Sequence, residues 1–254
     1  MGRARAVALL SLAACALPAA FGAALAGSRR AVAGAAAAAT LTLAQQVDPA
    51  AAAQRAAEAA SLTKKGVYAF MRNEVEASVD FFDDAIEAEP RVATRLWQRG
   101  LSLFYVDRFE DAAAQFASDV AENPNDTEEA VWHLLARARS VGLAEARSTM
   151  LAVGRDPRPV MRSVQSLYQR EDVDRRADVE KLAVSSDLHD AFYASLYLGL
   201  LAEAAGEAKT SQDWMLHALV DNAAYEKTGD YMFKLARVHA LRRNLPVENA
   251  KSEF

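Results

Sequence analysis

Two short stretches of this sequence carry residue types that could form a serine acyl-transfer site. Residues 61–64 are Ser-Leu-Thr-Lys, and residues 227–229 are Lys-Thr-Gly. In such a site the serine is the nucleophile, the lysine helps to activate it, and the Lys-Thr-Gly triplet lies on a strand beside the serine helix. Here the triplet precedes a helical pattern, and no convincing Ser-Asp-Asn triplet lies between the two stretches. We therefore predict that Ser61 begins a helix and that the chain is not an enzyme.

The sequence lacks the residue patterns that are typical of metal sites and phosphate-binding sites. No two of the four histidines are three to five residues apart, so no local metal pair is present. The acidic run 80–87 lacks the glycine and spacing of a calcium loop. Glycine-rich phosphate loops are also absent. We predict no catalytic residue, no metal and no cofactor. The histidines are His133, His189, His217 and His239.

The charge of the chain is unevenly distributed. Only four of the 29 Lys and Arg residues and one of the 34 Asp and Glu residues precede residue 55, so the rest carries a net charge of −8. An acidic body does not suit nucleic acid, which needs clustered Lys and Arg. The single cysteine, Cys15, lies in the N-terminal apolar stretch. Removal of that stretch would leave no thiol for a disulfide or a nucleophile.

The first 54 residues form the predicted targeting region. A basic start and an apolar run within residues 1–26 are typical of a secretory signal. A second unit follows, in which Ser28-Arg29-Arg30 precedes the apolar run 31–44. Tandem signals of this kind resemble the tripartite presequence of algae with complex plastids, which implies export to the thylakoid lumen. Two alternatives stay open: a bacterial lipoprotein anchored at Cys15 in the periplasm, because Leu-Ala-Ala-Cys matches a lipobox, and a single cleaved signal followed by an alanine-rich linker.

The body of the chain contains a 34-residue repeat. Aligning residues 59–92 with residues 93–126 matches small residues, aromatic residues and a proline in the same order. Such periods are typical of stacked helical pairs. Capping boxes are expected to begin each second helix at Asn73 and Asp107. The matched pairs are Leu62 with Leu96, Gly66 with Gly100, Phe70 with Phe104, Asn73 with Asp107, Glu76 with Glu110, Ser78 with Ala112, Phe82 with Phe116 and Pro90 with Pro124.

This repeat resembles the tetratricopeptide repeat (TPR), a helix–turn–helix unit. The resemblance implies an all-α, right-handed superhelix of about four TPR units, of which two are in strict register. The predicted solenoid covers residues 55–254. Its segments are units 59–92, 93–126 and 127–157, irregular helices in 160–184, a further unit at 192–225 and a capping helix at 230–243.

In TPR arrays the first helix of each unit lines a concave groove. The corresponding positions here are mostly apolar, so the groove is expected to be covered by a helix of this chain, by a partner or by a second copy. The carboxylate clamp of chaperone-binding TPR proteins does not fit, because its positions hold Thr63, Val67, Gln98, Glu128 and Trp132. The predicted groove residues are Thr63, Val67, Phe70, Met71, Trp97, Leu101, Phe104, Tyr105, Val131 and Leu135.

These features predict an exported, non-catalytic adaptor that binds protein partners, with Trp97, Phe104 and Tyr105 as the main contacts. We expect no nucleic acid and no small-molecule substrate, and a homodimer stays possible. The layout also resembles the NlpI-type periplasmic TPR lipoproteins. This resemblance rests on the stretch from Trp97 to Pro124, and it implies no functional residue in this chain. The partner would be a photosynthetic or lumenal complex in a plastid, or cell-envelope enzymes in a bacterium. A permanent structural subunit of a membrane complex is the alternative class.

Overall fold

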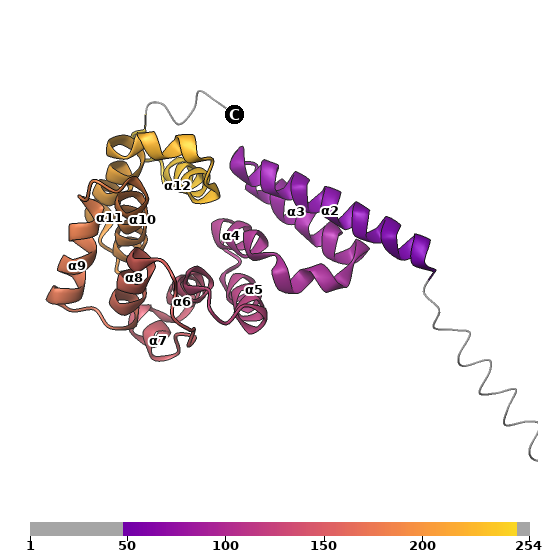
Figure 1. Cartoon of the computed structure of the whole chain (residues 1–254), viewed down its shortest axis with the longest axis horizontal. Coiled ribbons are helices and arrows are strands. Elements are labelled where there is room, and N and C mark those ends of the chain that lie inside the picture. Colours follow the sequence, from indigo (N-terminus) through magenta and orange to yellow (C-terminus); the bar gives the residue numbers. More distant parts are fainter. Residues whose placement is uncertain (1–47, 248–254) are drawn as a thin grey trace, which may run out of the picture. The chain divides into compact units, whose positions relative to one another are not determined.

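The computed structural model describes residues 48–247, and all regular structure within this range is helical, so the prediction of an all-α fold is confirmed. No helix in this range is long and apolar enough to cross a lipid bilayer. The helices, labelled as in Figure 1, are α2 (Pro49–Met71), α3 (Val75–Ala88), η1 (Pro90–Arg95), α4 (Trp97–Tyr105), α5 (Phe109–Glu122), α6 (Thr127–Val141), α7 (Leu143–Ser148), α8 (Pro159–Gln169), α9 (Val173–Ala183), α10 (Leu188–Ala204), α11 (Ala208–Leu216), η2 (His217–Asp221), η3 (Ala223–Thr228) and α12 (Tyr231–Arg242).

The first described helix begins earlier than the sequence suggested. The predicted targeting signals and Cys15 lie outside the described residues. Residues 49–54, which we assigned to the targeting region, belong to α2. Ser61 lies in the middle of this helix, so the prediction that it begins a helix was wrong. The alanine-rich segment before it explains the difference, because alanine has the highest intrinsic helix propensity.

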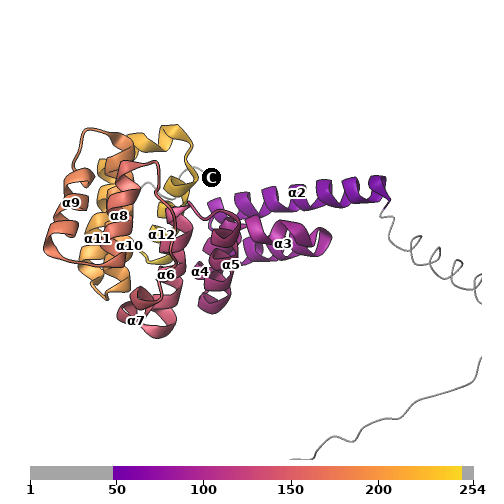
Figure 2. The ribbon, with the colours of Figure 1, turned by 60° about the horizontal axis from the view of Figure 1, so that its bottom comes forward.

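Neighbouring helices form pairs in which a small residue meets a large side chain. α2 packs against α3, α4 against α5 and α10 against α11 (Figures 1 and 2). A Cβ atom added to Gly66 would lie 2.9 Å from the Phe82 ring, and one added to Gly100 would lie 2.7 Å from the Phe116 ring. Glycine is therefore required for these helices to approach so closely. The third pair repeats the contact with Gly199 and Met215, at 3.0 Å.

The turns inside these pairs also match one another. Asn73 and Asp107, which are 34 residues apart, have φ angles of 61° and 60°. They occupy the left-handed region that asparagine and aspartate tolerate better than most residues. Gly206 has the same role in the third pair, with φ at 79°. The predicted capping boxes were wrong: α3 and α5 begin after Glu74 and Arg108, and neither position has a side-chain cap.

The middle of the chain departs from this regular pairing. Asp126 caps α6 by accepting a hydrogen bond from the Glu128 amide at 2.9 Å. α7 ends at Ser148, and the chain then runs without a helix to Arg158. Pro159 occupies the first turn of α8, where a proline is tolerated because its missing N–H has no helical partner.

α10 forms the centre of the C-terminal half. All its residues from Ala191 to Ala202 are buried, and it contacts α6, α8, α9 and α11. After η2 and η3, Asp230 caps α12, which corresponds to the predicted terminal helix. α12 lies beside the end of α2, far from it in the sequence (Figure 1). This return of the chain decides what covers the predicted groove.

Candidate functional site

The predicted groove residues lie on α2, α4 and α6, and most of them are inaccessible. Thr63, Val67, Met71 and Trp97 are half-buried. The Thr63 hydroxyl donates to the Ala59 carbonyl of its own helix at 2.8 Å. The α4 helix is covered on both faces, as its apolar circumference predicted. The buried members of the set are Phe70, Leu101, Phe104, Tyr105, Val131 and Leu135.

α12 covers part of this set through aromatic contacts. The Tyr231 ring stacks on Phe70 with centroids 5.7 Å apart, and meets Trp97 edge to face at 5.2 Å. At the other end of α12, His239 Nδ1 lies 3.0 Å from the Tyr105 hydroxyl. A helix of this chain, which is one of the three occupants that the sequence left open, therefore covers part of the predicted groove. Whether the groove also receives a partner stays a prediction.

Polar contacts hold α12 in place. Burial lowers the pKa of His239 to about 4, so this ring is neutral at pH 7 beside Tyr105. Arg242 donates to the Asn73 side chain at 3.0 Å and to both Glu76 oxygens at 2.8 Å. The Arg242 guanidinium holds the pKa of Glu76 down to about 2. The C-terminal end of α12 is thus tied to the turn between α2 and α3.

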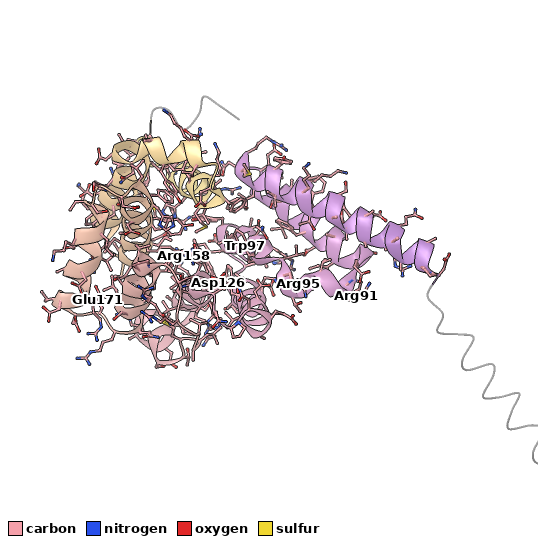
Figure 3. All side chains as sticks on the ribbon, viewed as in Figure 1. Arg91, Arg95, Trp97, Asp126, Arg158 and Glu171 are labelled. Carbon is pink, nitrogen blue, oxygen red and sulfur yellow. The ribbon has the colours of Figure 1, made fainter. Side chains whose placement is uncertain are left out.

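A cavity of about 230 Å³ lies where the N-terminal end of α12 meets α4, α6 and α10. Aromatic and acidic side chains dominate its wall, and Trp97 and Asp126 are labelled in Figure 3. Sequence reasoning did not identify this site, because its parts come from segments more than 100 residues apart. The lining residues are Trp97, Phe116, Asp126, Glu128, Glu129, Trp132, Tyr193, Asp230, Tyr231 and Met232.

Three of the four acids in this wall have hydrogen-bond donors from the protein. Asp126 caps α6. Glu128 accepts from Arg158 at 2.5 Å and from the Tyr197 hydroxyl at 2.8 Å. Asp230 caps α12 and accepts from the Tyr193 and Tyr225 hydroxyls. These contacts join α6, α8, α10 and α12 around the cavity.

Glu129 differs from the other three acids. Its side chain is 8% exposed, and Oε2 is buried without a hydrogen-bond partner among residues 48–247. Burial, together with the negative charges of Asp126, Asp119 and Glu128, raises the pKa of Glu129 to about 8. Trp132 Nε1 and the Tyr231 hydroxyl, on the same wall, are also buried and unpaired in the described part of the chain. Three polar atoms of residues that line the cavity thus have no partner within residues 48–247, and buried polar groups without a partner are uncommon in proteins.

A serine–histidine contact elsewhere does not form an activated nucleophile. Ser195 Oγ lies 2.9 Å from His217 Nδ1, and His217 Nε2 lies 3.7 Å from Asp221 Oδ2. However, Ser195 is fully buried, and its hydroxyl donates to the Ala191 carbonyl at 2.6 Å. The serine hydroxyl proton is therefore directed at its own helix and not at His217.

The other fragments named from the sequence remain separate. Lys227 and Thr228 lie in η3, and Gly229 forms a left-handed turn with φ at 73°, so the strand that serine acyl transfer requires is not found here. Asp187, His189 and Asp190 could together reach a metal ion. Asp187 is already used as the cap of α10. Asp187 therefore has a structural role within this cluster.

Comparison with known proteins adds no family to these observations. No protein-family model and no curated protein sequence matches this chain.

Proposed function

We propose that this chain is a non-catalytic TPR-like scaffold that binds protein partners through the concave face formed by α2, α4 and α6. The observation that carries the proposal is the recurrence of one packing contact. The pairs Gly66–Phe82 and Gly100–Phe116 are 34 residues apart and make the same close approach. The left-handed turn residues Asn73 and Asp107 recur at the same spacing. These are the features by which TPR units stack into a superhelix.

The occupation of the concave face by α12 supports a role in binding. α12 places Tyr231 against Phe70 and Trp97, as an amphipathic helix from a partner would. Trp97 remains half-buried, and it lines the adjoining cavity. Trp97 and its surroundings are therefore the part of the face on which a partner binds, with α12 as one wall of the interface.

In this proposal the targeting region determines the compartment in which the protein acts. The scaffold acts outside the cytosol, in the thylakoid lumen if the tandem signals act as a plastid presequence, or in a bacterial periplasm if Cys15 is lipidated. A permanent subunit of a membrane complex is the second candidate. Its isolated chain would aggregate, since half-buried Trp97 would then belong to an obligate interface.

A site-specific photo-crosslinker tests the proposal in the full-length protein. The crosslinking amino acid replaces Trp97, and the control carries it at Val173, which is 83% exposed and lies on α9. A scaffold gives a crosslinked product of fixed mass from position 97 but not from position 173. Its second component is identified by mass spectrometry and must co-purify with the wild-type chain. If position 97 links only to α12 of the same chain, the binding face is refuted.

A further inference from the structure

We propose that the cavity between α4, α6, α10 and α12 binds an organic cation with N–H donors, the guanidinium or ammonium group of an arginine, a lysine or an alkylamine. Glu129 is its carboxylate partner, and the surrounding aromatic side chains enclose it. This inference rests on the cavity alone and does not depend on the proposed scaffold function.

The carboxylate of Glu129 has no hydrogen-bond donor from the described part of the chain. Glu129 Oε2 is buried, and residues 48–247 supply no donor to it. The charged groups that act on it, Asp126, Asp119 and Glu128, are all negative. Burying an unpaired carboxylate is costly, and a cation that donates a hydrogen bond to it removes that cost. The carboxylate therefore lacks the cationic donor that would stabilise its charged form.

The wall of the cavity is rich in aromatic side chains. Five aromatic side chains line the cavity together with the acids, and cations are attracted to the faces of such rings. The protein already uses this arrangement nearby. The Arg158 guanidinium lies 5.7 Å from the centre of the Tyr193 ring while it donates to Glu128 and Asp156. A second guanidinium or ammonium group would pair with Glu129 in the same manner. The five aromatic residues are Trp97, Phe116, Trp132, Tyr193 and Tyr231.

The acids and the volume of the cavity indicate which kind of cation it binds. A bare metal ion would need several carboxylate oxygens close together. Among the described residues, the group of acids and histidines close enough for this is Asp187, His189 and Asp190, and it contains no acid of the cavity. The volume of about 230 Å³ exceeds that of engineered cavities of about 150 Å³ that bind benzene. An organic group of arginine side-chain size therefore fits the space better than an ion does.

Two further unpaired atoms, on residues that line the cavity, indicate which chemical groups of the ligand lie beside its positive charge. Trp132 Nε1 can only donate, so it needs an acceptor, and the Tyr231 hydroxyl can do either. A capped amino acid supplies such an acceptor in its amide carbonyl, close to the cationic side chain. A simple alkylamine does not. A higher affinity for the capped amino acid than for the alkylamine would therefore identify a protein side chain as the source of the cation.

The test is equilibrium binding to the purified full-length chain at pH 9. The probes are N-acetyl-arginine amide, its neutral counterpart N-acetyl-citrulline amide, n-butylamine and magnesium chloride. Binding is followed by tryptophan fluorescence, since Trp97 and Trp132 both line the cavity, and by calorimetry. We expect saturable binding of the arginine derivative, and an affinity at least tenfold lower for the citrulline derivative. Preference for the capped arginine over butylamine identifies a protein side chain as the source, and equal affinity identifies a free amine.

Two variants complete the test. Glu129→Gln keeps the shape of the side chain and removes the charge, and should weaken binding of the arginine derivative at least tenfold. Glu122→Gln changes the net charge equally at an exposed position of α5 and should leave binding unchanged. Circular dichroism verifies that both variants are folded. Equal affinity for arginine and citrulline derivatives, unchanged binding in Glu129→Gln, preference for magnesium, or no saturable binding at all would each overturn the proposal.

Discussion

Replacing Glu129 with glutamine should stabilise the protein in alkaline solution and leave its stability in acid almost unchanged. Glu129 is buried, its Oε2 has no donor within the described range, and its pKa is raised to about 8. An acid whose pKa is higher in the folded state than in the unfolded state binds its proton more tightly when folded. The free energy of unfolding therefore falls as the pH rises from 4.5 to about 8, and it stays low above that range.

The size of the effect follows from the same pKa values. A rise from 4.5 to about 8, at about 1.36 kcal/mol per pH unit, gives an upper limit of about 5 kcal/mol at pH 9. Local rearrangement around a buried charge reduces this cost, so we expect a gain of about 2 to 5 kcal/mol for Glu129→Gln. At pH 5 the protonated acid and the amide are nearly equivalent, and the difference should be below about 1 kcal/mol.

Urea unfolding at pH 5, 7 and 9, followed by tryptophan fluorescence, measures this difference. Asp119, whose pKa burial raises to about 7, is present in both proteins, so only its coupling to the charge of Glu129 differs between them. Glu122→Gln is the matched control, since Glu122 is exposed. A stability difference between wild type and Glu129→Gln that does not change with pH would refute the assignment of a buried, unpaired carboxylate. Destabilisation by Glu129→Gln at pH 9 would do the same.

Two further predictions concern the helix pairs and α12. Gly100→Ala places a methyl group 2.7 Å from the Phe116 ring, so it should lower the free energy of unfolding by about 1–3 kcal/mol, although alanine favours helices. Adding Phe116→Leu should restore part of this lost stability, as measured by urea unfolding. If the double variant recovers no stability, the contact between Gly100 and Phe116 is contradicted. Arg242→Met removes the hydrogen bonds to Glu76 and should cost at most about 1 kcal/mol globally, because Glu76 is largely exposed. Amide hydrogen exchange of α12 should nevertheless accelerate, and unchanged exchange would show that these bonds do not hold the helix.

Sequence periodicity predicted the helix pairs well where the packing is local. Gly66 and Gly100 are small because a ring from the next helix lies against each of them, and a contact within one pair leaves a fixed spacing in the sequence. The all-α class followed from the same periodicity. The turns were predicted less well. Asn73 and Asp107 were expected to cap a helix, yet they adopt the left-handed conformation that joins two helices. Both roles suit a short polar side chain, and sequence spacing does not distinguish them.

The cavity could not be predicted from the sequence. Glu129 and Trp132 lie one helical turn apart on α6, a spacing equally typical of an ordinary buried face. They become a candidate site only because α12 returns across the chain and places Tyr231 opposite them. The amino-acid sequence by itself determined the helices, the pairing of neighbours and the net acidity of the body. The tertiary structure alone decided which helix covers part of the predicted groove and which acid lacks a partner among the described residues, because both depend on contacts between residues about 100 positions apart.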